Sequence, residues 1–404
     1  MYSLTRFFRQ DHCHYPCWVA GRLHPSSSFF EFKSQGLTLV CSPFQQDSLK
    51  IDAQAGDWVA VHVHEFKNEK AFIKDYKILS SCKKKFQANK EQVFISQKWQ
   101  DFLIGVAGFF KSRGLIPVET PSLVRCPGTE PHLQVFETEI SPQKQKMFLP
   151  TSPEMHLKKM LCEDWTDFFE IKKCFRNGEL SSMHQPEFYM LEWYRAFFSS
   201  KDLIQETKEF FCFLNNQFSL KAEPLVFKEY SMQDLFLKYL NFSLTPETTK
   251  KELFLLAQKE DLICSQEASW EDLFHLLFLN KIEKQFQPHV VTFVKDYPPQ
   301  LRAYARINKH AWADRFEVYW KGFELANAFY EVIDPKEQKK LFEEHLKQRT
   351  DSVSYDQDLL EKMQQGMPPC SGIAIGLERL FLALYNKNKI SDIKIFPYQK
   401  EGSR

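Results

Sequence analysis

The chain has 404 residues, is 43% hydrophobic and 26% charged, and carries a formal net charge of +1 at pH 7. This length suggests two or three domains, and the composition is that of a globular protein with ample core. The balanced charge excludes a global basic field that would attract nucleic acid, although it allows a local patch. No apolar run reaches membrane-spanning length, and the N-terminus lacks the apolar core of a signal peptide.

Ten cysteines are scattered along the chain without a disulfide framework, which indicates a reduced, cytoplasmic protein. One segment, DHCHYPC, offers His12, Cys13, His14 and Cys17 as zinc ligands. No second ligand pair follows at zinc-finger spacing, so the segment by itself does not predict a zinc site.

The first part of the chain, residues 1–85, is predicted to be a small β domain. Its segments alternate in polarity or carry β-branched and aromatic residues, with polar or glycine-containing turns between them. Strands are expected at 17–23, 29–35, 37–42, 57–66 and 70–79. Five strands in this length suit a small barrel of the OB type, and a plain β-sandwich is the alternative. The polar, lysine-rich segment 81–92 is expected to be a linker to a second domain, 86–404.

The second domain is predicted to have an α+β fold. Residues 93–114 have helical spacing that ends at Gly114. Beyond this helix, strand-like segments joined by short loops indicate an antiparallel sheet, and residues 200–290 have a mostly helical pattern. The strands of this sheet are expected at 132–140, 168–176, 187–197 and 315–333.

Three polar stretches in this domain each have an ordinary structural explanation. In FLPTSPEMHLKKML, Ser152 before Pro153 predicts a helix start, and Glu154 suits the positive end of the helix dipole. In CSGIAIGLERL, small residues allow close approach to the backbone, and Arg379 follows at the opening of an apolar helix.

The third stretch joins two aromatic-rich strands by a polar loop. Arg176 at the end of one strand and Phe188 on the next are placed to clamp a phosphate and stack a base. The alternative is a surface hairpin with incidental charges.

A fourth stretch, RFEVYWKGFELANAFYE, spaces Glu317, Glu324 and Glu331 seven residues apart among apolar side chains. Acids in such a segment are costly to bury unless something pairs with them.

Taken together, these stretches resemble the class II aminoacyl-tRNA synthetases, specifically the lysyl branch. GLIPVETPSL is similar to the first motif of the family, CFRNGE with HQPEFYMLEWY to the second, and GIAIGLERL to the third. The fourth stretch resembles the metal and amino-acid segment of the lysyl branch. The resemblance covers about residues 90–400 and implies an antiparallel sheet flanked by helices. It also implies a homodimer with Pro121 at the interface.

The resemblance implies a ligase that uses ATP and Mg²⁺ and activates lysine or β-lysine. Glu317 and Glu324 are expected to ligate Mg²⁺ on the ATP phosphates, because a hard cation prefers carboxylate oxygens. Arg176 and Arg379 are the expected catalytic residues, contacting the α- and γ-phosphates. The ATP-binding positions implied are Arg176, Asn177, Gly178, His184, Gln185, Phe188, Glu324, Leu325, Gly376 and Arg379.

The resemblance also implies where the amino acid binds. Glu331 is expected to face its side-chain ammonium, with Tyr194 beside it, and Glu154 to take the other amine. The amino-acid positions implied are Ser152, Pro153, Glu154, Tyr194, Asn327, Glu331 and Ala374.

Two features depart from the family or from a regular strand. The family usually has Arg-Asn-Glu in its second motif, but Gly178 and then Glu179 follow here, so adenine is read by Glu179 or by a backbone carbonyl. A hairpin turning at Lys321–Gly322 puts Glu317 and Glu324 on one face. Strict alternation then puts Glu331 on the other, so the implied site needs a bulge near Leu325–Ala326.

Two subfamilies share these motifs: lysyl-tRNA synthetases, and a paralogue that attaches β-lysine to a lysine of elongation factor P. Ser152 and Ala374 stand where synthetases typically have alanine and glycine, which favours the paralogue and elongation factor P as the partner. One methyl group is worth about 1–3 kcal/mol of discrimination.

The N-terminal domain keeps tRNA open as a partner, because SSFFEFKSQG offers aromatic residues that stack on RNA bases, unless Phe29, Phe30 and Phe32 fill its core. A non-catalytic binding protein is the remaining alternative.

Overall fold

The chain, described by a computed structural model, divides into two compact units, Met1–Lys98 and Trp99–Arg404. The residues described are 2–3, 15–24, 30–34, 37–43, 52–83, 90–219 and 223–398. Helix α2, Lys90–Ser112, runs across the division and begins slightly earlier than predicted. Three of the four candidate zinc ligands, His12, Cys13 and His14, lie outside the described residues, as do residues 84–89 of the predicted linker.

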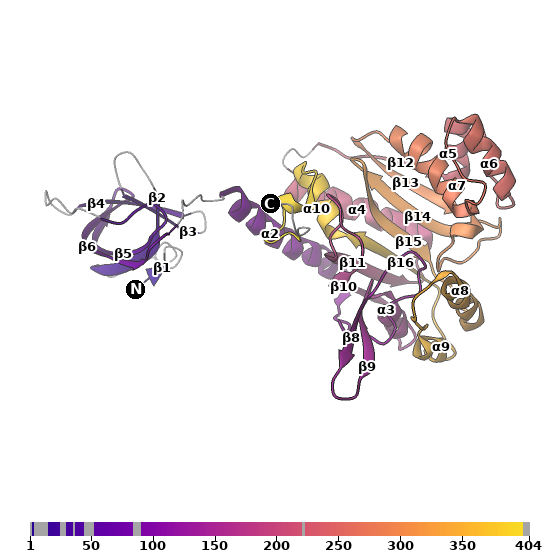
Figure 1. Ribbon diagram of the computed structural model, residues 1–404, viewed down its shortest axis with the longest axis horizontal. Helices are drawn as coiled ribbons and strands as arrows, with labels where there is room; N and C mark the ends of the chain where they lie inside the picture. The colour runs from indigo at the N-terminus through magenta and orange to yellow at the C-terminus, as the bar shows by residue number, and fades with distance from the viewer. Residues whose placement is uncertain are drawn as a thin grey trace. The chain divides into compact units, whose positions relative to one another are not determined.

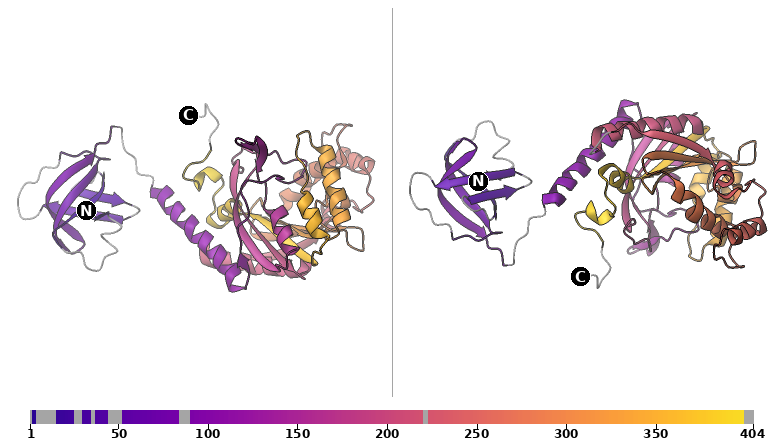
Figure 2. Two further views of the ribbon diagram at one scale, coloured as in Figure 1. Left: turned by 90° about the horizontal axis from the view of Figure 1, so that it is seen from below. Right: turned by 90° about the horizontal axis from the view of Figure 1, so that it is seen from above.

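The N-terminal unit contains the five predicted strands and a two-residue strand, β1. Its strands are β1 Tyr2–Ser3, β2 Cys17–His24, β3 Phe30–Ser34, β4 Leu37–Pro43, β5 Trp58–Lys67 and β6 Lys70–Ser80. The pairing runs β2-β3-β4-β6-β5, and β5 also pairs with β2. Figure 2 shows these strands curving around a common interior. Phe32 is buried there, so this aromatic side chain belongs to the core.

The second unit is built on an eight-stranded sheet in the order β12-β13-β14-β15-β16-β11-β10-β7 (Figure 1). The six central strands are antiparallel, as predicted, and the two outermost pairings are parallel. The strands are β7 Ile116–Pro117, β10 Asp167–Phe175, β11 Glu187–Ala196, β12 Val226–Ser231, β13 Val290–Tyr297, β14 Ala313–Trp320, β15 Phe323–Tyr330 and β16 Cys370–Gly376. A separate hairpin pairs β8 Phe136–Ile140 with β9 Gln145–Leu149.

Helices complete this unit: α3 Glu154–Leu161, α4 Ser200–Phe218, α5 Met232–Leu240, α6 Lys250–Lys259, α7 Trp270–Leu277, α8 Pro335–Gln348, α9 Gln357–Met363 and α10 Leu377–Tyr385. Helices α4 to α7 each begin with a capping box, in which a Ser or Thr and an acid three residues later exchange hydrogen bonds. The prediction that 200–290 is mostly helical missed β12. This edge strand has only one neighbour and no fully buried residue, so its apolar pattern is weak.

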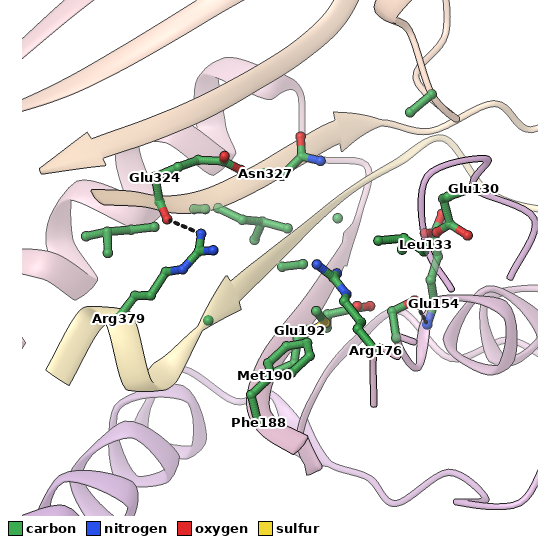
Figure 3. A pocket seen from close by; sticks show the side chains of 18 of the residues that line it. Glu130, Leu133, Glu154, Arg176, Phe188, Met190, Glu192, Glu324, Asn327 and Arg379 are labelled. Carbon is green, nitrogen blue, oxygen red and sulfur yellow. Dashed lines mark hydrogen bonds between the residues drawn. The ribbon is translucent and has the colours of Figure 1, made fainter. Parts of the chain in front are cut away.

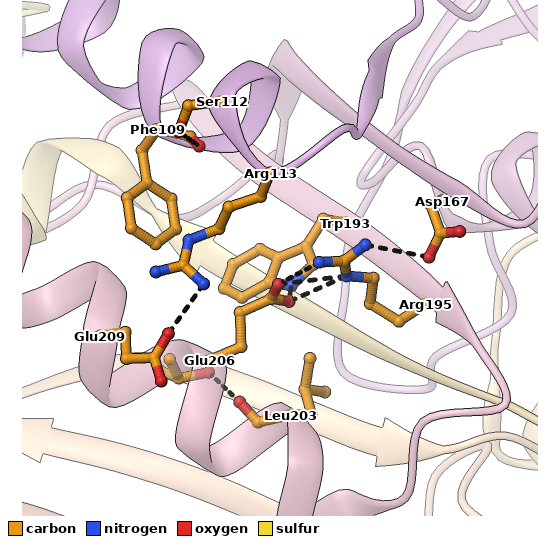
Figure 4. Close-up of polar contacts among 10 residues, drawn as sticks. Phe109, Ser112, Arg113, Asp167, Trp193, Arg195, Leu203, Glu206 and Glu209 are labelled. Carbon is orange, nitrogen blue, oxygen red and sulfur yellow. Dashed lines mark hydrogen bonds and ion pairs between the residues drawn. The ribbon is translucent and has the colours of Figure 1, made fainter.

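Helix α4 is anchored to one face of β11 (Figure 4). Trp193 Nε1 donates to Glu206 on α4 at 3.0 Å, and Arg195 Nε donates to the same carboxylate at 3.1 Å. Side chains alternate along a strand, so Glu192 and Tyr194 point to the opposite face. The helix therefore fixes which side of the sheet is left for a site.

None of the helices in the described part of the chain has the length and apolar character needed to span a bilayer.

Candidate active site

A cavity of about 310 Å³ lies on the face of β11, β15 and β16 to which Glu192 and Tyr194 point. Ala374 on β16 marks its floor, between Glu192 on β11 and Asn327 on β15. The predicted residues that line it are Ser152, Glu154, Arg176, His184, Gln185, Phe188, Tyr194, Glu324, Leu325, Asn327, Glu331, Ala374, Gly376 and Arg379.

Four predicted residues do not line the cavity: Pro153, Asn177, Gly178 and Glu317. Pro153 occupies the N-cap position of α3, so the helix start predicted with Ser152 before Pro153 was wrong by one position. Ser152 Oγ still accepts a long hydrogen bond, 3.4 Å, from Glu154 N. The Asn177 side chain accepts from Gly178 N, and Gly178 has a φ of +78°, so both residues shape a turn.

The predicted hairpin and bulge are both present. Lys321 and Gly322 form the turn with positive φ, and Tyr319 pairs with Glu324. Val318 then pairs with Ala326, which leaves Leu325 as the extra residue of a β-bulge. The bulge restores the register, so Glu317, Glu324, Asn327 and Glu331 share one face, as the implied site requires.

Glu317 is buried and has several protein partners. Tyr297 Oη donates to it at 2.6 Å, and Tyr319 Oη and the Arg315 guanidinium also bind it. Arg315 Nε also donates to Asn327 Oδ1 at 3.0 Å. Glu317 therefore holds Arg315 in place, and Arg315 in turn orients Asn327 in the cavity wall.

Glu324, in contrast, opens into the cavity and is accessible to solvent there. The walls of the cavity limit the hydration of the Glu324 carboxylate, and this desolvation raises its pKa. The nearby Glu317 carboxylate raises the pKa further, while Arg379 opposes the rise. The described residues contain no group of three or more His, Cys, Asp or Glu side chains arranged to hold a metal. A cation here would need ligands from a bound nucleotide as well as from Glu324.

At the same end of the cavity, Arg379 Nη1 donates to the Glu324 carbonyl at 3.1 Å (Figure 3). Its Nη2 contacts His184 Nε2. Because a guanidinium only donates, His184 Nε2 accepts and Nδ1 carries the proton toward Ser181 Oγ, 2.9 Å away. Burial and Arg379 both lower the pKa of His184, in agreement with a neutral ring.

Arg176 lies farther along the cavity, with its guanidinium 5.1 Å from the centre of the Phe188 ring. Glu179 Oε1 is 4.0 Å from Arg176 Nη1, and Glu179 lines the cavity as well. Arg176 Nε is buried and has no hydrogen-bond partner among the described residues. The second motif thus presents a guanidinium, an aromatic ring and a carboxylate to one space.

The far end of the cavity is acidic. Glu331 is 1% exposed, and burial raises its pKa to about 7 although Lys158 opposes the rise. Its Oε1 has no hydrogen-bond partner within the described structure. A Cβ added to Gly372 would lie 2.4 Å from the Tyr194 ring and 2.8 Å from Glu331 Oε1. Glycine is therefore needed at position 372, because the Tyr194 and Glu331 side chains occupy the space that a larger residue would fill.

Sequence reasoning missed Lys158, which is fully buried beside the acidic end. Its Nζ lies 2.6 Å from Glu154 Oε1 and 2.8 Å from Glu331 Oε2. The Tyr304 ring centre lies 4.8 Å from the same ammonium. The i, i+4 spacing of Glu154 and Lys158 on one helix was the available signal.

Glu179, a candidate for reading adenine, also lines the cavity. Other lining residues were not predicted as site residues: Glu130, Leu133, Met183, Met190, Glu192, Ala303, Tyr304, Ala326, Phe329, Gly372, Ile373, Glu378 and Ile390. Glu192 had a signal, because it lies two residues before Tyr194 on the same strand face. Glu130 and Tyr304 come from loops far away in sequence.

Comparisons with known proteins show the family of this chain. Residues 81–400 match the family model "tRNA synthetases class II (D, K and N)". Elongation factor P–(R)-β-lysine ligase of Proteus mirabilis is 36% identical over 301 residues, covering 72% of this chain and 90% of the relative. The ligases of Buchnera aphidicola (strain APS) and Vibrio atlanticus are each 35% identical, over 79% and 74% of this chain and 99% and 94% of their own lengths.

The resemblance inferred from the motifs is thereby confirmed. Residues 1–80 lie outside the match to the family model. The chain belongs to the class II tRNA synthetase family and is similar to the elongation factor P–(R)-β-lysine ligases.

Proposed function

We propose that this protein is an ATP-dependent ligase that activates (R)-β-lysine as an aminoacyl adenylate and transfers it to a lysine side chain of elongation factor P. The single observation that carries this proposal is the polarity of the cavity. Arg176 and Arg379 supply cationic donors along one part, and Glu331 supplies a buried, partly unpartnered carboxylate at the other. This arrangement suits a nucleotide at one end and an ammonium at the other.

In the first step, a carboxylate oxygen of the amino acid attacks the α-phosphorus of ATP. The bond to the bridging oxygen breaks, and pyrophosphate leaves. Arg176 would stabilise charge on the α-phosphate and Arg379 on the γ-phosphate. Phe188 would stack on adenine, with His184 and Gln185 near the nucleotide.

In the second step, the neutral amine of a protein lysine attacks the activated carbonyl. An amide bond forms, AMP leaves, and the amine loses a proton. Catalysis is by positioning and charge neutralisation, without a covalent enzyme intermediate.

Glu324 is better placed than Glu317 to ligate a magnesium ion. Glu324 projects into the cavity beside a second carboxylate that raises its pKa, which favours a cation there. Glu317 already has Arg315, Tyr297 and Tyr319 as partners. Magnesium bound with ATP would neutralise phosphate charge, with Glu324 as its principal protein ligand and Glu317 orienting the wall behind it.

The N-terminal unit supports the alternative of a compact lysyl-tRNA synthetase. Its strands pair in the order β2-β3-β4-β6-β5, β5 also pairs with β2, and β4 is parallel to β6, which supports a five-stranded barrel of the OB type. We propose that fold for residues 17–80, and that the domain boundary lies in the linker near residue 85. Transfer of lysine to tRNA is the outcome that would favour this alternative.

We propose a homodimer formed through the first motif. Ile116 on β7 is 51% exposed, and Leu123, at the end of the same motif, is 41% exposed. Exposed apolar side chains grouped on one motif mark an interaction surface. A second copy of this chain is the partner expected there, with Pro121 within the interface.

The adenylation step is tested by amino-acid-dependent exchange of pyrophosphate into ATP. Arg176→Ala removes one preorganised donor and should lower the exchange rate by about 100- to 1,000-fold. Exchange near the wild-type rate in this variant, with wild type active, would contradict the assignment of Arg176 to the α-phosphate.

A further inference from the structure

Glu130 is a carboxylate of the cavity wall that none of the sequence motifs includes. It lies in the loop before β8, on the same side of Arg176 as Glu154 and away from Arg379 (Figure 3). Its Oε2 is buried and has no hydrogen-bond partner in the described parts of the chain. A buried carboxylate oxygen without a donor is costly, so the position calls for a functional explanation.

The loop that carries Glu130 is held firmly. Thr129 Oγ1 lies 2.7 Å from Tyr304 Oη, and the Arg349 guanidinium donates to the Glu130 carbonyl. Gly128 has a φ of +127°, and a Cβ there would lie 2.5 Å from Glu130 Oε2. The carboxylate is therefore fixed in place against a glycine rather than free to turn into solvent.

Four polar groups face Glu130 from different elements. Burial raises the pKa of Glu130, and Glu154 on α3 raises it further. Arg176 and Arg349 oppose the rise, and the resulting pKa is about 7. Burial raises the pKa of Tyr304, on the loop after β13, and the negative charge of Glu130 adds to that rise. Glu130 is thus an acid poised to lose its proton when a cation arrives.

The Lys158 ammonium pairs with other carboxylates than that of Glu130. It is shared between Glu154 and Glu331. Glu130 and the remaining oxygen of Glu154 therefore form a carboxylate pair on the side of the cavity near Arg176, which would stabilise the α-phosphate that the substrate carboxyl attacks. An amine close to that carboxyl would meet this pair.

We propose that Glu130 is a specificity-determining residue that, together with Glu154, binds the ammonium nearest the carboxyl group of a diamino acid substrate. Glu331 is left to bind the distal ammonium. With Glu130 as a second carboxylate acceptor, the binding site for this ammonium extends beyond Glu154. This suits an amine placed one carbon farther from the carboxyl group of the substrate, as in a β-amino acid. This inference rests on the proposed function and concerns only its substrate recognition.

The test compares (R)-β-lysine and L-lysine with 6-aminohexanoic acid, which has the distal amine but no proximal one. In Glu130→Gln, kcat/KM for pyrophosphate exchange with the two diamino acids should fall about 10- to 100-fold, the scale of a lost hydrogen bond to a charged group. The value for 6-aminohexanoic acid should not change. Glu137→Gln, an exposed acid on β8, is the control and should leave every substrate unaffected.

Calorimetry provides a readout that a purely structural role would not change. At pH 7, binding of (R)-β-lysine to wild type should release more protons than binding of 6-aminohexanoic acid, measured in buffers of different ionisation enthalpy. Glu130→Gln should remove that difference, and Glu130→Asp serves if the amide variant fails to fold. Equal losses for all three substrates, or an unchanged proton release, would overturn the inference. Wild type without exchange activity would instead overturn the proposed function, while calorimetry would still report on Glu130.

Discussion

The ammonium of Lys158 lies 2.8 Å from Oε2 of Glu331, and neither side chain is exposed to solvent. The same ammonium lies 2.6 Å from Glu154, so one protein cation joins the two carboxylates proposed to bind the two amines of the substrate. Burial alone would lower the pKa of Lys158, but the two carboxylates raise it above its usual value. Lys158 therefore stays charged and keeps both acids in position.

Lys158→Met should destabilise the protein by about 3–5 kcal/mol at pH 8, because two buried carboxylates lose the cation that they share. The loss should shrink toward pH 5.5. Burial already raises the pKa of Glu331, and the variant lacks the cation that opposes the rise, so the folded-state pKa lies above the unfolded value and stability falls as pH rises through it. Urea unfolding at both pH values measures this effect.

Lys159→Met is the matched control for that experiment. Lys159 pairs with Asp356 and Asp358 but is partly exposed, so its loss should cost about 1 kcal/mol or less. A pH-independent loss in Lys158→Met would contradict the shared-cation account.

Glu324→Gln should raise the magnesium concentration needed for half-maximal pyrophosphate exchange at least tenfold, because a metal ligand is lost. Its stability at pH 8 should not decrease, since the substitution removes a carboxylate whose pKa is already raised. Glu317→Gln should instead lower the melting temperature, because it breaks contacts with Arg315 and Tyr297. Equal magnesium dependence in wild type and Glu324→Gln would show that this acid does not ligate the metal.

Ala374→Gly should shift the ratio of adenylate formation from (R)-β-lysine toward L-lysine, because one methyl group on the cavity floor is worth about 1–3 kcal/mol of discrimination. Ala328→Gly removes the same methyl group from the neighbouring strand, outside the cavity lining, and controls for loss of stability. If both variants keep the wild-type ratio, Ala374 does not shape the substrate position.

Ile116→Asp should weaken dimerisation and lower activity, because it places a charge in the proposed apolar interface. Ile263→Asp changes an isoleucine that is 98% exposed outside the first motif and should do neither. Sedimentation equilibrium measures both variants. A fully active wild-type monomer would contradict the proposed interface.

The parts of the site that could be predicted from the sequence are those whose residues lie close together along the chain. Glu317, Glu324 and Glu331 lie on one hairpin, whose turn was predicted at Lys321–Gly322. The bulge near Leu325–Ala326 was predicted because strict alternation conflicted with the face that the family resemblance implies for Glu331. The antiparallel central strands and the second-motif loop with Arg176 were likewise predicted from residues close together along the chain.

The acidic end of the cavity required contacts between distant segments. Lys158 is four residues from Glu154, but its approach to Glu331 depends on how α3 meets β15. Glu130 reaches the cavity only because Arg349 and Tyr304 hold its loop. Strand β12 was missed because an edge strand packs on one side only and leaves little pattern in its sequence.

The measurement that tests the central claim most directly is a transfer assay with purified elongation factor P and lysine tRNA, each offered with radiolabelled (R)-β-lysine or L-lysine, ATP and Mg²⁺. The account predicts label on a lysine of elongation factor P, higher with (R)-β-lysine, and little on tRNA. Preferential charging of tRNA with L-lysine, with elongation factor P left unlabelled, would contradict it and identify a compact lysyl-tRNA synthetase. ATP binding without transfer to either acceptor would contradict it in favour of a non-catalytic binding protein.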